Sequence, residues 1–316
     1  MALGRSALPA GPVLAQSQRL AVLSLAAPEP RPPGVSGFAG DLLNTWQADH
    51  DSAVDYATLL FSQIADESAN AFGAGYRYDV LYDWARIPEV VGSNNLVELG
   101  PILSPDLIAD LAPSQGASVS WQDKQYGLVP TLSPMLLFYN RELFQAAGIA
   151  HPPTTWDEMK ETVDAFGGSY QYGLIMPYGA TAGIGGVASV WMAFLQQAGG
   201  RMYDEFGRPT FNDTPGVDAL QFMIDLLPIT MLESFSLFGY GDVSYRMTQR
   251  NAAMTFSFPV FWDSLNPNVA PADAIIQPAV MPKGPVNNAT ISGVDAWTIA
   301  AASPNIELSR QLIEFY

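Results

Sequence analysis

Apolar positions along the chain follow two alternating patterns. Short apolar runs are typical of buried strands, and stretches in which apolar residues return every three or four positions are typical of amphipathic helices. The strands that we expect cover residues 19–25, 53–60, 78–82, 135–139, 172–176, 252–256, 276–280 and 298–302, and the helices cover 38–46, 61–72, 155–166, 187–198, 215–227 and 303–316. This alternation is typical of an α/β fold, and over residues 19–82 it predicts a mostly parallel sheet with helices on both faces, in which ligands bind beyond the carboxyl ends of the strands.

The most informative stretch is 126–166, which reads YGLVPTLSPMLLFYNRELFQAAGIAHPPTTWDEMKETVDAF. Its apolar strand runs into a short helix, and the pair Pro152-Pro153 stops that helix and forces an extended entry to the next one. Thr155 and Glu158 then form a capping box, in which each side chain satisfies a free backbone N–H. Apolar residues of the capped helix recur at spacings that place them on one face: Trp156, Met159, Val163 and Phe166.

The order of the short sequence motifs in this stretch resembles that of a known protein family. An apolar strand is followed by Tyr-Asn-Arg-Glu at 139–142, Ala-Gly at 147–148 and Pro-Pro-Thr-Thr-Trp-Asp-Glu at 152–158. This order resembles the inter-lobe crossing of extracellular solute-binding protein family 1, the sugar-binding, maltose-binding-protein-like proteins of ATP-binding cassette (ABC) transporters. Short sequence motifs similar to those of the family also occur at 199–204, 209–212, 252–255 and 300–305.

The resemblance implies a two-lobe, periplasmic-binding-protein-like α/β fold of type II with inter-lobe crossings. We expect 1–18 to be a leader or signal-peptide remnant, 19–132 plus 292–316 to form lobe I, and 133–291 to form lobe II. Two departures stand out. Family members continue past the position of Tyr316, so we expect the C-terminal part of lobe II to be missing. The family's Gly-Pro-Trp also appears here as Phe258-Pro259-Val260, with Trp262 two positions later.

Composition narrows the classes of partner. The 316 residues include 31 acidic and 14 basic side chains, for a net charge of −17. Nucleic-acid binding needs a basic patch, and anionic membrane surfaces would repel this chain. Cysteine is absent, which rules out disulfides, thiolate metal sites and a cysteine nucleophile. Val13-x-Ala15 resembles a signal-peptide cleavage site, although Pro9 and Pro12 interrupt the leader, so a disordered leader remains the alternative. A periplasmic or extracellular location is expected.

Catalytic patterns are weak. His50 and His151 lack metal-ligand spacing, and the sequence carries no phosphate loop, dinucleotide fingerprint or nucleophile elbow. Pairs of carboxylates could serve a glycosidase, but 31 acids produce such pairs by chance. We therefore expect no enzyme activity, no cofactor and no metal site.

Sugars present apolar C–H faces and a rim of hydroxyls, which aromatic rings and polar groups can match. Candidate ligand-binding residues lie near the ends of the predicted strands, in the loops after them or in the two inter-lobe crossings: Ser24, Asp83, Trp84, Ser133, Tyr178, Trp262, Asp263 and Asp295. By resemblance, the loop of Asp83 and Trp84 faces the cleft, and Tyr178 follows Pro177 where maltose-binding protein has a sugar-stacking tyrosine. The alternatives are a helix cap for Asp83, core packing for Trp84 and Trp262, and a surface position for Tyr178.

The resemblance implies that the chain captures a sugar or oligosaccharide in the inter-lobe cleft and delivers it to an ABC permease, acting as a monomer. A polyol, a sugar phosphate or a polyamine is the first alternative, and a carbohydrate-active enzyme is the second. A phosphate ligand would need an arginine fork, and Arg86 is the one arginine near a candidate loop.

Overall fold

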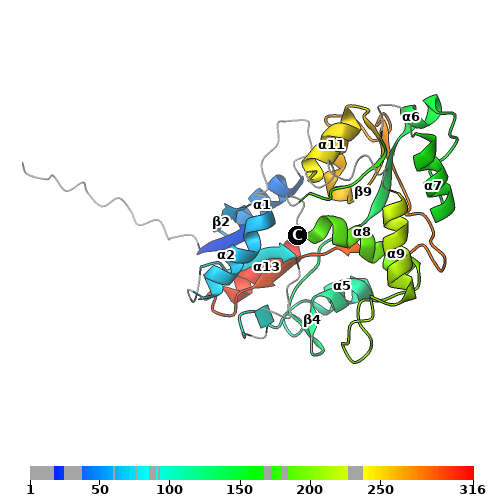
Figure 1. The fold of residues 1–316 in the computed structure, drawn as a ribbon. Coiled ribbons are helices and arrows are strands. Elements are labelled where there is room, and N and C mark those ends of the chain that lie inside the picture. Colours follow the sequence, from blue (N-terminus) through cyan, green and yellow to red (C-terminus); the bar gives the residue numbers. More distant parts are fainter. Residues whose placement is uncertain are drawn as a thin grey trace, which may run out of the picture. The chain divides into compact units, whose positions relative to one another are not determined.

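A computed structural model describes residues 18–24, 38–59, 61–73, 75, 77–84, 90–91, 93–166, 172–179, 184–226 and 238–316. The chain divides into two compact units (Figure 1). Unit 1 comprises Met1–Thr131 and Val294–Tyr316, and unit 2 comprises Leu132–Gly293. Residues 1–17 of the expected leader, Arg86 and most of the Tyr178–α8 connection lie outside the described residues, as do the side chains of Asp83 and Trp84.

Unit 1 is built on a four-stranded sheet. Its strands are β1 (Gln18–Ser24), β2 (Ser52–Thr58), β3 (Val80–Trp84) and β12 (Asp295–Ile299). They lie in the order β12-β3-β1-β2, with β1 parallel to β2 and β3, and β12 antiparallel to β3. The prediction of a mostly parallel sheet is confirmed for this unit. The carboxyl ends of β1, β2 and β3 therefore meet at one edge, where β12 begins.

Helices cover both faces of this sheet. The unit contains α1 (Phe38–Asp49), α2 (Phe61–Gly73), α4 (Pro105–Asp110), α5 (Pro113–Ser118) and α13 (Ile306–Phe315), and a small hairpin of β4 (Ser120–Trp121) and β5 (Lys124–Gln125). Successive strand residues point to opposite faces. Val22 packs in one apolar cluster with Trp46 of α1 and Leu312 of α13, whereas Leu23 packs in another with Ile64 of α2.

Unit 2 has its own sheet. Its strands are β7 (Leu136–Asn140), β8 (Tyr172–Ile175), β9 (Ala252–Ser257) and β10 (Ile276–Ala279), in the order β10-β7-β9-β8. Only β8 and β9 are parallel among these pairs, because β7 runs antiparallel to both of its neighbours. The first residue of β7, Leu136, pairs with Ser257 at the end of β9.

Seven helical segments accompany this sheet in the described part of unit 2. They are α6 (Arg141–Ala146), α7 (Trp156–Ala165), α8 (Ile184–Gln197), α9 (Thr214–Asp225), α11 (Tyr240–Thr248), the 3₁₀ turn η3 (Pro259–Phe261) and α12 (Trp262–Leu265). The predicted apolar face of α7 is confirmed, since Met159 and Val163 are buried in the main cluster with Leu174 of β8. Central strand β9 is buried along its whole length.

Thr154 strengthens the capping box of α7. Thr155 Oγ1 accepts a hydrogen bond from the Glu158 N–H at 3.2 Å, as expected. The Glu158 carboxylate also accepts from the backbone N–H and the hydroxyl of Thr154, both at 2.7 Å. These bonds lower the pKa of Glu158.

Two element boundaries differ from the expectation because long-range contacts set them. Strand β3 continues to Trp84 since Asp295 and Ala296 of β12 pair with Trp84 and Asp83. Asp83 and Trp84 therefore lie on the strand, and not in a loop after it. Helix α13 begins at Ile306 and not at Ser303, whose hydroxyl instead accepts from the Asn305 N–H at 3.0 Å and donates to buried Asp79 at 2.6 Å.

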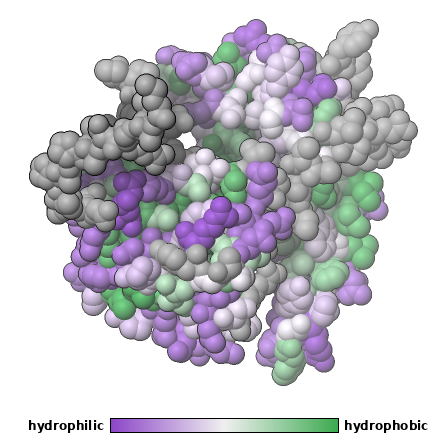
Figure 2. All heavy atoms as spheres, turned by 90° about the vertical axis from the view of Figure 1, so that its left-hand side faces the viewer, coloured by the Kyte–Doolittle hydropathy of each residue, from purple (hydrophilic) through white to green (hydrophobic). Residues whose placement is uncertain are grey.

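Hydrophilic residues, purple in Figure 2, and hydrophobic residues, green, are interspersed over the coloured part of the face drawn there. Among the described residues, no helix is both long and apolar enough to cross a membrane.

Candidate functional site

The carboxyl edge of the unit 1 sheet brings together four of the predicted residues. Ser24 ends β1 beside Thr58 of β2, and Asp83 and Trp84 end β3. Asp295 starts β12 directly opposite Trp84. Residues from separate strands converge here because parallel strands end at the same side of a sheet. We call this group the unit 1 edge.

Tyr82 adds an aromatic ring to the unit 1 edge. Its ring centroid lies 4.3 Å from that of Trp297 on β12, which is buried in the core. Burial raises the pKa of Tyr82 to about 12, and the negative charge of Asp295 acts in the same direction. The hydroxyl therefore stays protonated at neutral pH and can donate a hydrogen bond. Trp297 packs against this ring and is itself a core residue.

The corresponding edge of the unit 2 sheet brings together the other four predicted residues. Tyr178 follows the end of β8, Trp262 and Asp263 follow the end of β9, and Ser133 precedes β7, which starts at that end. Tyr178 and Trp262 are half-buried and pack against the same apolar cluster. Asp263 is exposed. We call this group the unit 2 edge.

Tyr178 is held by contacts on both sides. Its hydroxyl donates to Met176 Sδ at 3.2 Å, and the next residue, Gly179, donates its N–H to the Phe238 carbonyl at 2.7 Å. Burial raises the pKa of Tyr178, so its hydroxyl is protonated throughout the neutral range. The Gly179–Phe238 bond also brings the start of α11 to the unit 2 edge.

Sequence reasoning missed an aromatic pair at this edge. Tyr240, the first residue of α11, stacks on Phe261 with ring centroids 4.5 Å apart and planes inclined by 9°. Burial raises the pKa of Tyr240 to about 12. Tyr240 begins a helix, and no predicted strand ends shortly before it, so the rule of searching after strand ends does not find it. The available signal was the density of aromatic residues in 235–245.

Two predicted hydroxyls are less accessible than expected. Ser24 is 4% exposed, in contrast to the expectation that it faces a ligand. Ser133 Oγ is buried and has no hydrogen-bond partner in the part of the chain that is described. Within the same described residues, no group of three or more histidine, cysteine, aspartate or glutamate side chains is placed to hold a metal ion.

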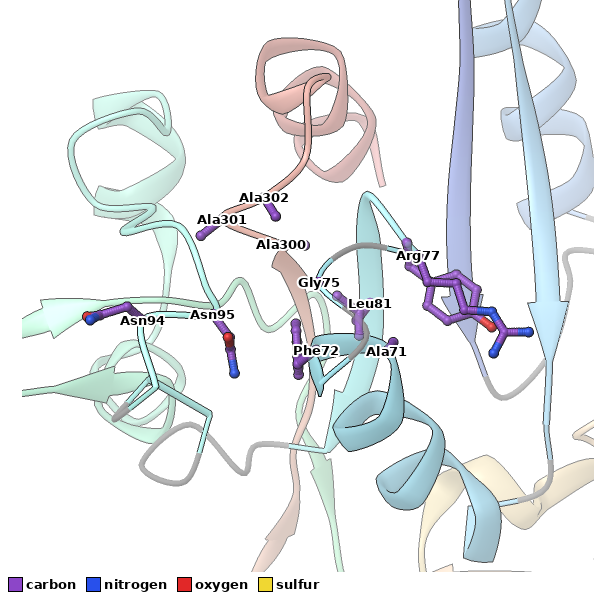
Figure 3. A pocket seen from close by; sticks show the side chains of 11 residues that line it. Ala71, Phe72, Gly75, Arg77, Leu81, Asn94, Asn95, Ala300, Ala301 and Ala302 are labelled. Carbon is purple, nitrogen blue, oxygen red and sulfur yellow. The ribbon is translucent and has the colours of Figure 1, made fainter.

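A small cavity lies at the opposite end of β3, between Phe72, Asn95 and Ala300–302 (Figure 3). In Figure 3 the guanidinium of Arg77 points away from Asn95, and Glu67 binds it at 2.5 Å. The cavity holds about 60 Å³. That space suits a few waters at most, since one water occupies about 30 Å³ in the liquid. It is too small for a sugar ring.

A larger groove of about 600 Å³ lies between α8 and α9 of unit 2, which pack side by side. Its lining is almost entirely apolar and includes Trp191 and Phe211. On α9, Val217, Leu220 and Ile224 are 59%, 51% and 51% exposed. A sugar site needs convergent polar groups, which the lining of this groove lacks, so the two strand edges remain the better candidates.

Comparison with known proteins supplies the family. Residues 31–316 match the sequence pattern of the bacterial extracellular solute-binding protein family. A Brucella abortus (strain 2308) protein, whose name describes it as a candidate binding protein, is 44% identical over 55 residues. That match covers 16% of this chain and 13% of the Brucella protein, so it spans only a small part of that relative.

Solved structures resemble the fold over most of this chain. A solute-binding protein of Thermotoga lettingae TMO bound to α-D-tagatose has a TM-score of 0.79 at 22% identity, covering 95% of this chain and 76% of its own. Maltose-bound MalE3 of T. maritima has a TM-score of 0.79 at 21% identity, covering 95% and 77%. A mannitol-bound solute-binding protein of Agrobacterium vitis S4 has a TM-score of 0.73 at 20% identity, covering 94% and 72%.

These structural matches fall below 25% identity and establish the fold, a two-lobe α/β architecture like that of MalE. The family match extends over nearly the whole chain. The chain belongs to the bacterial extracellular solute-binding protein family.

Proposed function

We propose that this protein captures a sugar, an oligosaccharide or a polyol between its two units and delivers it to the permease of an ABC transporter. The observation that carries the proposal is the gathering of aromatic and polar residues at one edge of each sheet. The unit 1 edge supplies Tyr82, Trp84 and carboxylates, and the unit 2 edge supplies Tyr178, the Tyr240–Phe261 stack and Trp262.

Aromatic rings and protonated hydroxyls suit such a solute. Rings match the C–H faces of a sugar, and tyrosine hydroxyls and carboxylates match its hydroxyl rim. Tyr82 and Tyr240 keep their protons well above neutral pH, because burial raises both pKa values to about 12. We propose Asp83, Trp84, Tyr178, Trp262, Asp263 and Asp295 as ligand contacts. The buried hydroxyls of Ser24 and Ser133 would support these edges unless ligand binding exposes them.

A polyol is kept beside a sugar as the solute class because a family-like structure holds mannitol. A sugar phosphate would need an arginine fork. The charged residues that we assign to the two edges are the aspartates Asp83, Asp263 and Asp295, and negative charge does not favour a phosphate. Carboxylates would also suit a polyamine, so a polyamine belongs in any ligand screen.

The remaining proposals follow from the family. A protein of this kind works outside the cytoplasm, so we propose a periplasmic or extracellular location and a membrane permease as its partner. We also propose that it acts as a monomer and leaves its solute chemically unchanged. Incubation with oligosaccharides followed by chromatography should return them intact, and a product whose formation stops on changing one carboxylate to its amide would establish an enzyme instead.

A thermal-shift screen tests the solute class. The panel contains maltose, tagatose, mannitol, ribitol, glucose 6-phosphate and spermidine. Ligand that binds only the folded chain adds about 2.7 kcal/mol to its stability at 100 times Kd. We expect a rise in melting temperature with at least one neutral sugar or polyol. A rise with glucose 6-phosphate or spermidine alone would contradict the proposal.

A further inference from the structure

Both passages of the chain into unit 2 are paired with each other. Unit 2 begins at Leu132 and ends at Gly293, and β6 (Ser133–Pro134) pairs antiparallel with β11 (Ser292–Gly293). The Ser133 N–H donates to Ser292 Oγ at 3.0 Å. Directly after β6, the Met135 N–H donates to the Ile291 carbonyl at 2.8 Å. We call this pair of segments the crossing ladder.

The Phe258 side chain lies next to the end of the crossing ladder. A Cβ placed on Gly293 would lie 3.8 Å from Phe258 Cδ1 and 3.7 Å from Ser133 Cβ, so the edge of the Phe258 ring lies just beyond the position that a side chain at 293 would take. Phe258 is half-buried, and both it and Ile291 pack against the main core cluster of unit 2. The ring is therefore placed beside the ladder while it packs against the core of the unit.

The backbone on either side of Phe258 is fixed. Ser257 pairs with Leu136 at the end of β9, and the Phe258 carbonyl accepts from the Phe261 N–H at 3.0 Å. These bonds therefore fix the backbone that positions the Phe258 ring beside the ladder. A ladder of two short strands is marginal on its own and needs packing against a larger body.

From this placement we infer that Phe258 is a positioning residue for solute capture, an inference that rests on the proposed function. Its ring fixes the crossing ladder to the core of unit 2, so that the ladder moves as part of that unit. Any change in the placing of the two units is then confined to the few residues around Thr131–Leu132 and Gly293–Val294. Confining the motion reduces the number of open arrangements that solute binding must select from, and so raises affinity.

Amide hydrogen exchange and calorimetry on the full chain test this inference. In Phe258→Ala the ring is lost, and we expect exchange at the Ser133 and Met135 amides to become about tenfold faster. Exchange at the β8 and β9 amides should stay unchanged. The Kd for the solute that gives the largest thermal shift should rise about fivefold. Phe258→Leu keeps apolar contact and should remain within about twofold of the parent. Gly293→Ala is the second control, since its Cβ would make only ordinary contacts.

The outcomes separate the two claims. If no member of the solute panel binds the parent chain, the proposed function fails, while the exchange data still report on the ladder. If the parent binds solute and Phe258→Ala leaves both Kd and ladder exchange unchanged, the inference is overturned. It is also overturned if exchange rises equally throughout unit 2, because the ring would then have a general structural role. A Phe258→Leu variant that behaves like Phe258→Ala would overturn it too, because the apolar contact that leucine keeps would then not fix the ladder.

Discussion

Replacement of Asp79 by alanine should destabilise unit 1 more than any exposed charge does. Asp79 is 1% exposed and stands just before β3. Its carboxylate accepts hydrogen bonds from the Ala21 N–H at 2.8 Å, the Ser303 hydroxyl at 2.6 Å and the Asn305 side-chain amide at 3.1 Å. One carboxylate therefore joins β1, β3 and the segment that leads into α13.

The expected cost follows from those three donors. A buried polar group left without a partner costs about 1–3 kcal/mol, and the Ser303 and Asn305 side chains can regain partners by rotating or by reaching water. We expect Asp79→Ala to lose roughly 2–4 kcal/mol. For a unit of this size each kcal/mol moves the melting temperature by about 2–4 °C, so a fall of about 4–16 °C is expected by scanning calorimetry.

Asp55→Ala is the matched control. Asp55 also lies on a strand of this sheet and pairs with Arg19, but its side chain is 57% exposed. Exposed ion pairs contribute about 0–1 kcal/mol, so this variant should melt within a few degrees of the parent. If Asp79→Ala costs no more than Asp55→Ala, the buried network does not hold the three segments together and the argument from unsatisfied donors is wrong.

Three further predictions concern single side chains. Tyr240→Ala should weaken solute binding about tenfold by removing the stacked ring, whereas Tyr245→Ala on the same helix, 64% exposed, should leave the Kd from calorimetry unchanged; equal effects would contradict the role of the stack. The pKa of Tyr82 in the folded protein, about 12, exceeds the ordinary value of 10.0. The contribution of Tyr82 to the free energy of unfolding is therefore present below pH 10 and lost as pH rises to 12. Urea unfolding should show that the parent loses stability more steeply over this pH range than Tyr82→Phe does, and identical pH profiles would refute this. Leu220→Asp in the α8–α9 groove should change the melting temperature little because Leu220 is 51% exposed, whereas Phe222→Ala, at 2% exposed, should cost about 3–5 kcal/mol; a large loss in Leu220→Asp would show that the groove is covered in solution.

Local patterns predicted the elements well where a single segment decides them. The α7 face is correct because its apolar spacing depends on the helix alone. Strand β3 was placed two residues early, because its end depends on β12, more than 200 residues away in sequence. The antiparallel direction of β7 in the sheet of unit 2 also depends on pairing with a strand more than 100 residues away in sequence. Strand pairing between distant segments is not encoded in periodicity.

The candidate site was predicted in part for similar reasons. Searching after strand ends found Tyr178 and Trp262, which the structure places at one edge of a sheet. The search missed Tyr240, because tertiary contacts such as the Gly179–Phe238 hydrogen bond, and not sequence position, bring the start of α11 to that edge. Burial also separates candidates that look alike in sequence: Asp263 is exposed, whereas Ser24 is 4% exposed. Side-chain accessibility depends on tertiary packing that a single sequence does not display.

The central claim is that one solute contacts both units, and isothermal titration of three chains tests it most directly. The parent, Trp84→Ala at the unit 1 edge and Trp262→Ala at the unit 2 edge are titrated with the same sugar or polyol. Both variants should remain folded and bind at least about tenfold more weakly, a loss of about 1.4 kcal/mol each. Full affinity in either variant would contradict the claim, because the solute would then be held without that edge.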